Sequence, residues 1–325
     1  MTDIQRAVAL LRQGELVALP TETVYGLGAD ALNPDAVAKI FAAKGRPSDH
    51  PLIVHLADAE ALTAWARDIP KEAIALARAF WPGPLTLILK KEEGVPDIVT
   101  GGQDTVGLRV PNHPVALQLL RAFGSGLAAP SANRFGRISP TTAEHVRQEL
   151  GDRVPLILDG GPCQVGLEST ILDLSREVPV ILRPGAIGAD DIARVIGRRP
   201  RLRGEDAQAS TEAAPRVSGA LAAHYAPRTP LELVNGASLA SCVREGDAVL
   251  ARVPQPAGLP ADVLWIEAPA AAAAYGHDLY ARLRALDSAA FRRILVETPP
   301  GGADWSAVID RLGRAAVGSG ADEET

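Results

Sequence analysis

The chain has 325 residues, with 33 lysines and arginines against 39 aspartates and glutamates, so its formal net charge is −6. This length predicts two domains. The hydrophobic fraction of 47% and the charged fraction of 22% are typical of a globular protein and exclude bulk disorder. The acidic balance also argues against binding of nucleic acid through its phosphates, because proteins that bind in this way usually carry an excess of basic residues.

The sequence lacks the marks of a membrane or secreted protein. No apolar run approaches the about 20 residues that a membrane helix needs, and residues 1–6 lack the apolar core of a signal peptide. Cys163 and Cys242 are too far apart to suggest a disulfide framework, and two cysteines do not make a metal site alone. We therefore expect a cytoplasmic protein with no membrane association.

The first 203 residues alternate short leucine-rich or β-branched runs with helical stretches. This pattern predicts strands over residues 16–19, 52–56, 85–89, 106–110, 156–158, 170–173 and 180–182. It predicts helices over residues 34–43, 70–80, 114–123 and 142–150, and the first three have proline near their first turn. Strands and helices that alternate at this spacing predict an α/β domain over residues 1–203.

The alternation stops over residues 204–230, a polar and alanine-rich segment that closes with Pro-Arg-Thr-Pro and is predicted to be an extended linker. It then resumes. Strands are predicted over residues 231–234, 248–251, 263–266 and 294–296, and helices over residues 238–244, 270–286 and 304–316. Residues 231–325 are therefore predicted to form a small, doubly wound, Rossmann-like α/β domain.

Polar and glycine residues gather at the strand ends of the first domain. Residues 20–28 (Pro-Thr-Glu-Thr-Val-Tyr-Gly-Leu-Gly) follow a buried strand and suggest a binding loop that ends in flexible glycines, although a turn capped by threonines would look the same. Lys44 and Arg46 flank Gly45, which would let the backbone approach a ligand. An ordinary helix end also favours cations at this position, because of the helix dipole.

Three further groups are weaker when taken singly. His55 ends a predicted strand, where a lone histidine is usually structural. Ser131 and Asn133 offer both donors and acceptors among small neighbours that leave room for a flat ligand. Residues 159–161, 166–170 and 183–185 are compatible with ordinary strand-end turns. None of these groups matches a Walker loop, a GxSxG elbow or a zinc pattern.

In this order, however, the segments resemble one family. Residues 20–28, 44–55, 131–133, 166–171 and 182–185 together resemble the threonylcarbamoyl-AMP synthase family, the YrdC-like proteins. The pairs Lys44/Arg46 and Ser131/Asn133 match the family's KxR and SxN signature. His-Tyr-Ala-Pro at residues 224–227, followed by the second domain, resembles the family's two-domain form. The implied fold is a twisted mixed sheet with a concave ligand cleft, plus a smaller Rossmann-like domain.

The chain departs from the family pattern at three positions. His50 stands where an asparagine usually precedes Pro-Leu, and Phe135 replaces a small residue after the SxN motif. Ser218 precedes a glycine where proline is common. All three lie outside the KxR and SxN pairs.

The resemblance implies that L-threonine, bicarbonate or CO2, and ATP give threonylcarbamoyl-AMP and pyrophosphate, which makes the enzyme a nucleotidyltransferase. The product would pass to a tRNA threonylcarbamoyl transferase to make threonylcarbamoyladenosine, without strong direct tRNA binding by this chain. Mg²⁺ is expected to accompany ATP, and no metal ligands are predicted in the chain. Because the carbamate of threonine and the triphosphate are both anions, the reaction needs cations and a site that excludes water.

The resemblance also assigns residues to this reaction. Lys44 and Arg46 are the implied catalytic residues. The implied ATP contacts are Lys44, Arg46, His50, Thr105, Ser131, Asn133, Ser139, Arg183 and Tyr225. The implied threonine contacts are Thr23, His55, Arg109 and Ser169, with Arg109 suited to the carboxylate. Tyr225 is predicted to act as a lid over the nucleotide; alternatively it anchors the linker onto one of the domains.

Two other functions stay open at this point. One is an RNA-binding module without catalysis, since the family's first domain offers a broad concave face, although the net charge of −6 argues against it. The other is carbamoyl-adenylate chemistry in hydrogenase maturation, where a similar domain sits in a larger protein. That larger protein carries zinc-binding cysteine pairs, and this sequence has no CxxC motif.

Overall fold

The computed structural model describes residues 2–205, 214–288 and 291–320, so residues 206–213 of the predicted linker lie outside it. The chain forms two compact units. Unit 1 contains Met1–Phe135, Pro140–Gln164 and Glu168–Ala220. Unit 2 contains Gly136–Ser139, Val165–Leu167 and Leu221–Thr325. The division falls inside the segment predicted as a linker, and two short stretches from the predicted first domain cluster with unit 2.

Unit 1 is built on one mixed sheet, as the family resemblance implied. Its strands are β1 (Val17–Leu19), β2 (Gly26–Asp30), β3 (Ile53–His55), β4 (Leu85–Lys90), β5 (Thr105–Arg109), β6 (Leu127–Ala128), β7 (Leu156–Ile157), β8 (Thr170–Asp173), β9 (Val180–Arg183) and β10 (Arg201–Leu202). They lie in the order β10-β9-β8-β4-β5-β3-β6-β2-β1-β7. The pairs β3–β5, β4–β8, β1–β7 and β9–β10 are parallel, and the other neighbours are antiparallel.

The helices that the structure describes in unit 1 are α1 (Asp3–Arg12), α2 (Pro34–Lys44), α3 (Lys71–Phe80), α4 (Asp97–Thr100), α5 (Pro114–Phe123), α6 (Ala143–Leu150) and α7 (Ala189–Ile196), with short 3₁₀ turns η1 (Glu60–Ala64) and η2 (Gly151–Arg153). Four of these helices, α2, α3, α5 and α6, lie within one residue of their predicted bounds. For α2, the Asn33 side chain accepts from the N–H of Ala36, and Gly45 ends the helix with φ of 64°. Helix α1 packs on α5, and α3 packs on α7.

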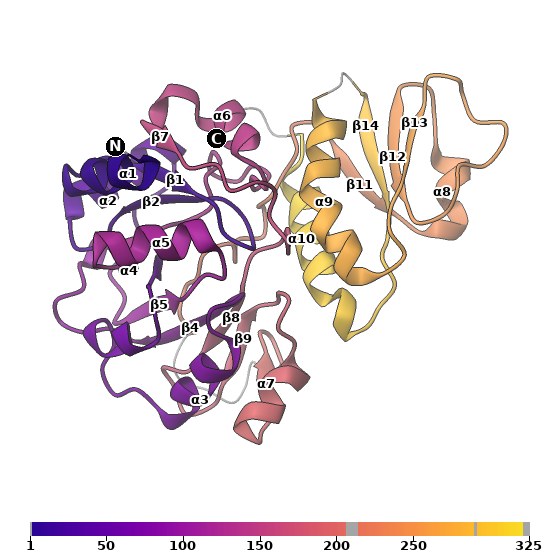
Figure 1. The fold of residues 1–325 in the computed structure, drawn as a ribbon. Helices are drawn as coiled ribbons and strands as arrows, with labels where there is room; N and C mark the ends of the chain where they lie inside the picture. The colour runs from indigo at the N-terminus through magenta and orange to yellow at the C-terminus, as the bar shows by residue number, and fades with distance from the viewer. Residues whose placement is uncertain (1, 206–213, 289–290, 321–325) are drawn as a thin grey trace. The chain divides into compact units, whose positions relative to one another are not determined.

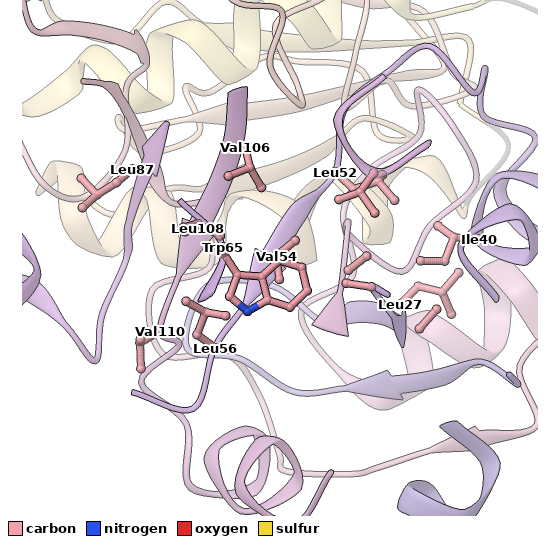
Figure 2. Close-up of a cluster of buried hydrophobic side chains, with 14 of the residues drawn as sticks. Leu27, Ile40, Leu52, Val54, Leu56, Trp65, Leu87, Val106, Leu108 and Val110 are labelled. Atoms are coloured by element: carbon pink, nitrogen blue, oxygen red, sulfur yellow. The ribbon is translucent and has the colours of Figure 1, made fainter. Parts of the chain in front are cut away.

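Alternation along the strands separates a core face from a site face. Val54, Val106 and Leu108 point into the hydrophobic cluster drawn in Figure 2, together with Ile40 of α2 and Trp65. Side chains of neighbouring strand residues point to opposite faces. Thr105 and Arg109 of β5 and His55 of β3 therefore belong to the other face, where His55 is the register partner of Arg109.

One predicted loop is partly a strand. Residues 20–28 were expected to end in flexible glycines, but Gly26 and Gly28 lie in β2 and pair with β1. A Cβ on Gly28 would approach the Cδ2 of Leu19 to 2.9 Å and the carbonyl oxygen of Val17 to 3.2 Å. The prediction of flexibility was wrong because Gly28 allows close packing between strands and does not serve as a hinge.

Unit 2 has the predicted Rossmann-like architecture. Its strands are β11 (Leu231–Val234), β12 (Asp247–Ala251), β13 (Leu264–Glu267) and β14 (Arg293–Glu297), all parallel in the order β11-β14-β12-β13. Its helices are α8 (Gly236–Cys242), α9 (Ala272–Asp287) and α10 (Ser306–Gly318), with η3 (Ala303–Trp305) before α10. Figure 1 shows α9 and α10 together on one face of this sheet and α8 on the other.

In the part of the chain that the structure describes, no helix combines the length and the apolar character needed to cross a membrane.

Candidate active site

The KxR and SxN motifs meet through the side chain of Lys44. Its ammonium group donates to the carbonyl oxygen of Ser131 at 2.6 Å and to that of Asn133 at 2.5 Å. The backbone N–H of Phe135 donates in turn to the Lys44 carbonyl oxygen at 2.8 Å. Motifs that are almost ninety positions apart are therefore joined at the end of α2.

Burial makes the Lys44 charge costly. Lys44 is 3% exposed, and burial followed by the nearby Arg46 cation holds its pKa well below the ordinary value, against a smaller opposing effect of Glu149. An ammonium has three N–H donors, and two of them point at carbonyl oxygens. An anionic group bound near the third would raise the pKa of Lys44 and stabilise its charged form.

Two further cations converge on Ser218. Arg46 donates from one terminal nitrogen to the Pro51 carbonyl oxygen and to the Ser218 hydroxyl, both at 3.0 Å. Arg183 donates to the Ser218 carbonyl oxygen at 3.0 Å and twice to the Ser169 carbonyl oxygen, at 2.8 and 3.1 Å. Both arginines are buried. A residue of the predicted linker thus connects the two arginines that the sequence assigned to the triphosphate.

A second group surrounds Arg109, at the end of β5. Its guanidinium donates to the Thr23 hydroxyl at 2.9 Å and lies 2.7 Å from a carboxylate oxygen of Glu22. Both members of this ion pair are buried, at 4% and 3% exposure. The other Glu22 oxygen accepts from the N–H of Asn112 at 2.9 Å. Glu22 therefore fixes the orientation of Arg109, which was predicted to bind the threonine carboxylate.

His55 lies beside Arg109 and is neutral. Burial, followed by the Arg109 charge, lowers its pKa from 6.5 to about 3. At neutral pH its ring can donate from one nitrogen and accept at the other, and it does not add a positive charge.

Ser169 contacts Arg183 of the first group through its hydroxyl and its carbonyl oxygen. Its hydroxyl lies 2.7 Å from that of Thr86 and accepts from Arg183 at 3.2 Å. Ser169 was predicted to bind threonine and Arg183 to bind triphosphate, so the structure brings these two predicted subsites into direct contact.

The remaining predicted contacts of unit 1 lie near Arg46 or along β5. The His50 ring meets the Phe135 ring edge-on, with centroids 5.3 Å apart. Thr105 begins β5, two residues before Gly107, which pairs with Ile53. It is therefore placed at the Pro51 end of the parallel pair β3–β5. His55 and Arg109 lie at the opposite end, about 13 Å away at the rise of an extended strand.

Two predicted ATP contacts belong to unit 2. Ser139 is buried, and its carbonyl oxygen accepts from Arg284 at 3.5 Å. Tyr225 has a left-handed backbone, with φ of 61°, which for a non-glycine residue must be stabilised by its surroundings. It stacks on Tyr280 at 5.8 Å and lies 5.1 Å beneath the Arg311 guanidinium. Within unit 2, Tyr225 therefore has the contacts of an anchor; its predicted action as a lid stays a prediction.

Sequence reasoning gave no role to Glu22, to the ring of Phe135 or to the hydroxyl of Ser218. Glu22 could have been found, since a buried arginine at a strand end requires a carboxylate or several acceptors. Ser218 could not, because its contact with Arg46 spans 172 positions.

Comparison with known proteins matches both units. Residues 9–185 match the Sua5/YciO/YrdC family, described as "Telomere recombination". Residues 187–317 match the domain described as "Threonylcarbamoyl-AMP synthase, C-terminal domain". A threonylcarbamoyl-AMP synthase of Bacillus subtilis is 50% identical over 234 residues, which cover 72% of this chain and 67% of that protein.

Two further comparisons extend over nearly the whole chain. The threonylcarbamoyl-AMP synthase of Schizosaccharomyces pombe is 37% identical, over 96% of this chain and 88% of that protein. The crystal structure of P. abyssi Sua5 complexed with L-threonine has a TM-score of 0.87 and 37% identity, and the match covers 98% of this chain and 96% of that one. The chain therefore belongs to the Sua5/YciO/YrdC family, as a two-domain member related to the threonylcarbamoyl-AMP synthases.

Proposed function

We propose that this chain joins L-threonine, bicarbonate or CO2, and ATP into threonylcarbamoyl-AMP with release of pyrophosphate, as an adenylyl-transferring enzyme. One observation carries the proposal. Lys44, Arg46 and Arg183 are buried cations that the SxN loop, Ser169 and Ser218 hold together, beside a separate Arg109–Glu22–Thr23 group. Such a pair of subsites suits one highly anionic substrate and one amino acid.

The first subsite is assigned to ATP. Lys44 supplies a point charge, and Arg46 and Arg183 supply planar groups that can bind phosphate oxygens through two donors. Ser131, Asn133, Thr105 and His50 are assigned to the nucleotide around them. We also propose that Ser139 and Tyr225 contact ATP, with Tyr225 acting as a lid, as the sequence predicted.

The second subsite is assigned to threonine. Arg109, oriented by Glu22, would bind the carboxylate, and Thr23 and Ser169 offer hydroxyl groups to the amino acid. The neutral ring of His55 can accept or donate a hydrogen bond without repelling the ammonium group of the substrate.

The chemistry needs positioning and charge compensation. The threonine amine adds to CO2, and an oxygen of the resulting carbamate attacks the α-phosphorus of ATP in line as pyrophosphate leaves. Buried cations stabilise the charge that develops on the phosphate oxygens more strongly than the same cations would in water. No side chain of the chain is assigned a covalent bond to substrate.

Mg²⁺ is proposed to enter with ATP. Among the residues that the structure describes, no three His, Cys, Asp or Glu side chains are grouped so that they could hold an ion on their own. An ion that enters with ATP would be bound chiefly by phosphate oxygens, and no step above passes through it.

The product is proposed to pass to a tRNA threonylcarbamoyl transferase in the cytoplasm. A basic cluster near α7 gives little support to direct RNA binding, because acidic side chains accompany it. Arg194 pairs with Asp191, Arg199 with Asp190, and Arg198 lies 3.5 Å from Glu72. The net charge of −6 points the same way.

The decisive experiment combines pyrophosphate release with mass spectrometry of the product. Purified chain with ATP, threonine and bicarbonate should release pyrophosphate and form a compound with the mass of threonylcarbamoyl-AMP. Omission of threonine or bicarbonate should stop both, and serine should react poorly because one lost methyl contact costs about 1–3 kcal/mol. Equal turnover with unrelated amino acids, or none with threonine, would overturn the assignment.

A further inference from the structure

Arg46 is restrained in two different ways. One terminal nitrogen donates to both the Pro51 carbonyl oxygen and the Ser218 hydroxyl. The guanidinium carbon also lies 5.6 Å from the centre of the Phe135 ring, within the range of a cation–π contact. The hydrogen bonds fix one corner of the guanidinium, and the ring restrains its plane.

Phe135 is itself tied to the segment that carries Arg46. Its backbone N–H donates to the carbonyl oxygen of Lys44, two residues before Arg46. The Lys44 side chain binds the carbonyl oxygens of Ser131 and Asn133 in the same loop. The backbone that carries the ring is therefore joined at three points to the segment that carries Arg46.

His50, four residues after Arg46, contacts the Phe135 ring from another direction. Its ring meets the Phe135 ring at an interplanar angle of 82°, the edge-to-face geometry that aromatic pairs favour. Burial, followed by the Arg46 charge, lowers the pKa of His50; Arg216 acts in the same direction and Asp49 opposes them. A neutral His50 supports the ring without repelling Arg46.

We propose that Phe135, supported by His50, is a positioning residue that fixes the Arg46 guanidinium for the phosphates of ATP. The inference rests on the proposed function, which supplies the ligand for Arg46. Phe135 acts through Arg46, so its removal should matter when Arg46 is present and should matter little when it is absent.

The test is a double-mutant cycle on ATP binding, measured by calorimetry on the full chain without threonine. Phe135→Leu should raise the Kd for ATP about tenfold, since desolvated cation–π contacts are worth about that much. In the Arg46→Gln background the same change should alter Kd less than twofold. Phe135→Tyr keeps the ring and should keep the affinity.

Phe123→Leu, in α5, is the matched control for loss of a partly buried ring. Equal weakening by Phe135→Leu in both backgrounds, or none in either, would overturn the positioning role. Urea unfolding checks that the variants fold. If Phe135→Leu does not fold, Phe135→Met takes its place in the same cycle. If the unaltered chain binds no ATP, the proposed function fails as well. If it binds ATP and the cycle shows no coupling, only the positioning role fails.

Discussion

Three cations of the proposed site in unit 1 and three arginines of unit 2 are held by different kinds of partner. In unit 2, arginines pair with carboxylates: Arg252 with Glu297 at 2.5 Å, Arg282 with Asp278 at 2.8 Å, and Arg314 with Asp310 at 2.8 Å. In unit 1, Lys44, Arg46 and Arg183 donate to carbonyl and hydroxyl oxygens. A carboxylate both orients and neutralises a cation, whereas a neutral oxygen orients it without adding a compensating charge.

This difference separates structural cations from cations suited to a ligand. Lys44 donates to two neutral carbonyl oxygens and burial holds its pKa well below the ordinary value, so an anionic ligand near it would stabilise its charged form. Arg109 lies between the two types, because it is paired with Glu22 and yet lies beside Thr23 and His55. The following predictions test the comparison, from the largest expected effect to the smallest.

Removal of a site cation should have the largest effect. Lys44→Met and Arg46→Met should each lower kcat/KM for ATP by about 10²–10³-fold, the size seen when one group that stabilises transition-state charge is lost. Arg252→Met in unit 2 should leave kcat/KM unchanged but destabilise the fold by about 1–3 kcal/mol, because Glu297 loses its partner. Steady-state kinetics and urea unfolding measure both, and near-normal turnover of either site variant would remove that residue from the phosphate subsite.

Glu22→Gln should specifically weaken threonine binding. The amide has one acceptor oxygen, so it cannot serve both Arg109 and the N–H of Asn112. We expect KM for threonine to rise about tenfold, or about 1.4 kcal/mol, with KM for ATP nearly unchanged. Glu144→Gln, at an exposed position of α6, is the control. A threonine KM that stays the same or falls would show that Glu22 does not orient Arg109.

His55 should make the stability of the protein depend on pH. Its folded pKa of about 3 lies below the ordinary 6.5, so the unfolded chain binds the proton first and stability falls as pH drops through this window. Between pH 7 and pH 5 the loss should be about 2 kcal/mol from this residue. Urea unfolding of His55→Gln should show a correspondingly smaller pH dependence than the unaltered chain. His277→Gln, at a half-exposed position, serves as the control, and identical slopes for all three proteins would contradict the buried neutral state.

Ser218→Ala should have the smallest effect. It removes one neutral acceptor from Arg46, and such hydrogen bonds contribute about 0.5–1.5 kcal/mol, which corresponds to a twofold to tenfold lower kcat/KM for ATP. The Ser218 carbonyl oxygen, which Arg183 uses, stays in place. Ser241→Ala in α8 should change nothing. A loss as large as that of Arg46→Met would mean that Ser218 itself contacts the substrate.

Much of the fold was predictable because the core follows the local pattern. Strands β3, β4, β5 and β8 and the three proline-started helices lie within a few residues of their predicted positions, since hydrophobic periodicity and caps act over short distances. Helices α1, α4 and α7 and the two-residue strands β6 and β10 were not predicted. Strand β2 was read as a loop because glycine seldom marks a strand interior.

The site was predictable only where a motif carried it. The KxR and SxN pairs were named from the sequence, and the structure joins them through Lys44. The partners that orient the arginines were not predicted, because they depend on tertiary contacts. Glu22 meets Arg109 and Ser218 meets Arg46 only once distant strands and the segment after β10 have come together.

The interleaving of the two units along the chain has a consequence for synthesis on the ribosome. The carbonyl oxygen of Ser139 accepts from Arg284, 145 positions later, and Gly136 accepts from the N–H of Ala226 at 2.8 Å. At about 5–20 residues per second, the ribosome needs roughly 7–30 s to make the residues between Ser139 and Arg284. By the end of that time most of unit 1 has left the ribosome. Gly136–Ser139 and Val165–Leu167 cluster with residues 221–325, most of which are made during this interval. The loop that follows the SxN motif is made with the first unit but can take its final form only after residues 226 and 284 of the second unit have been synthesised.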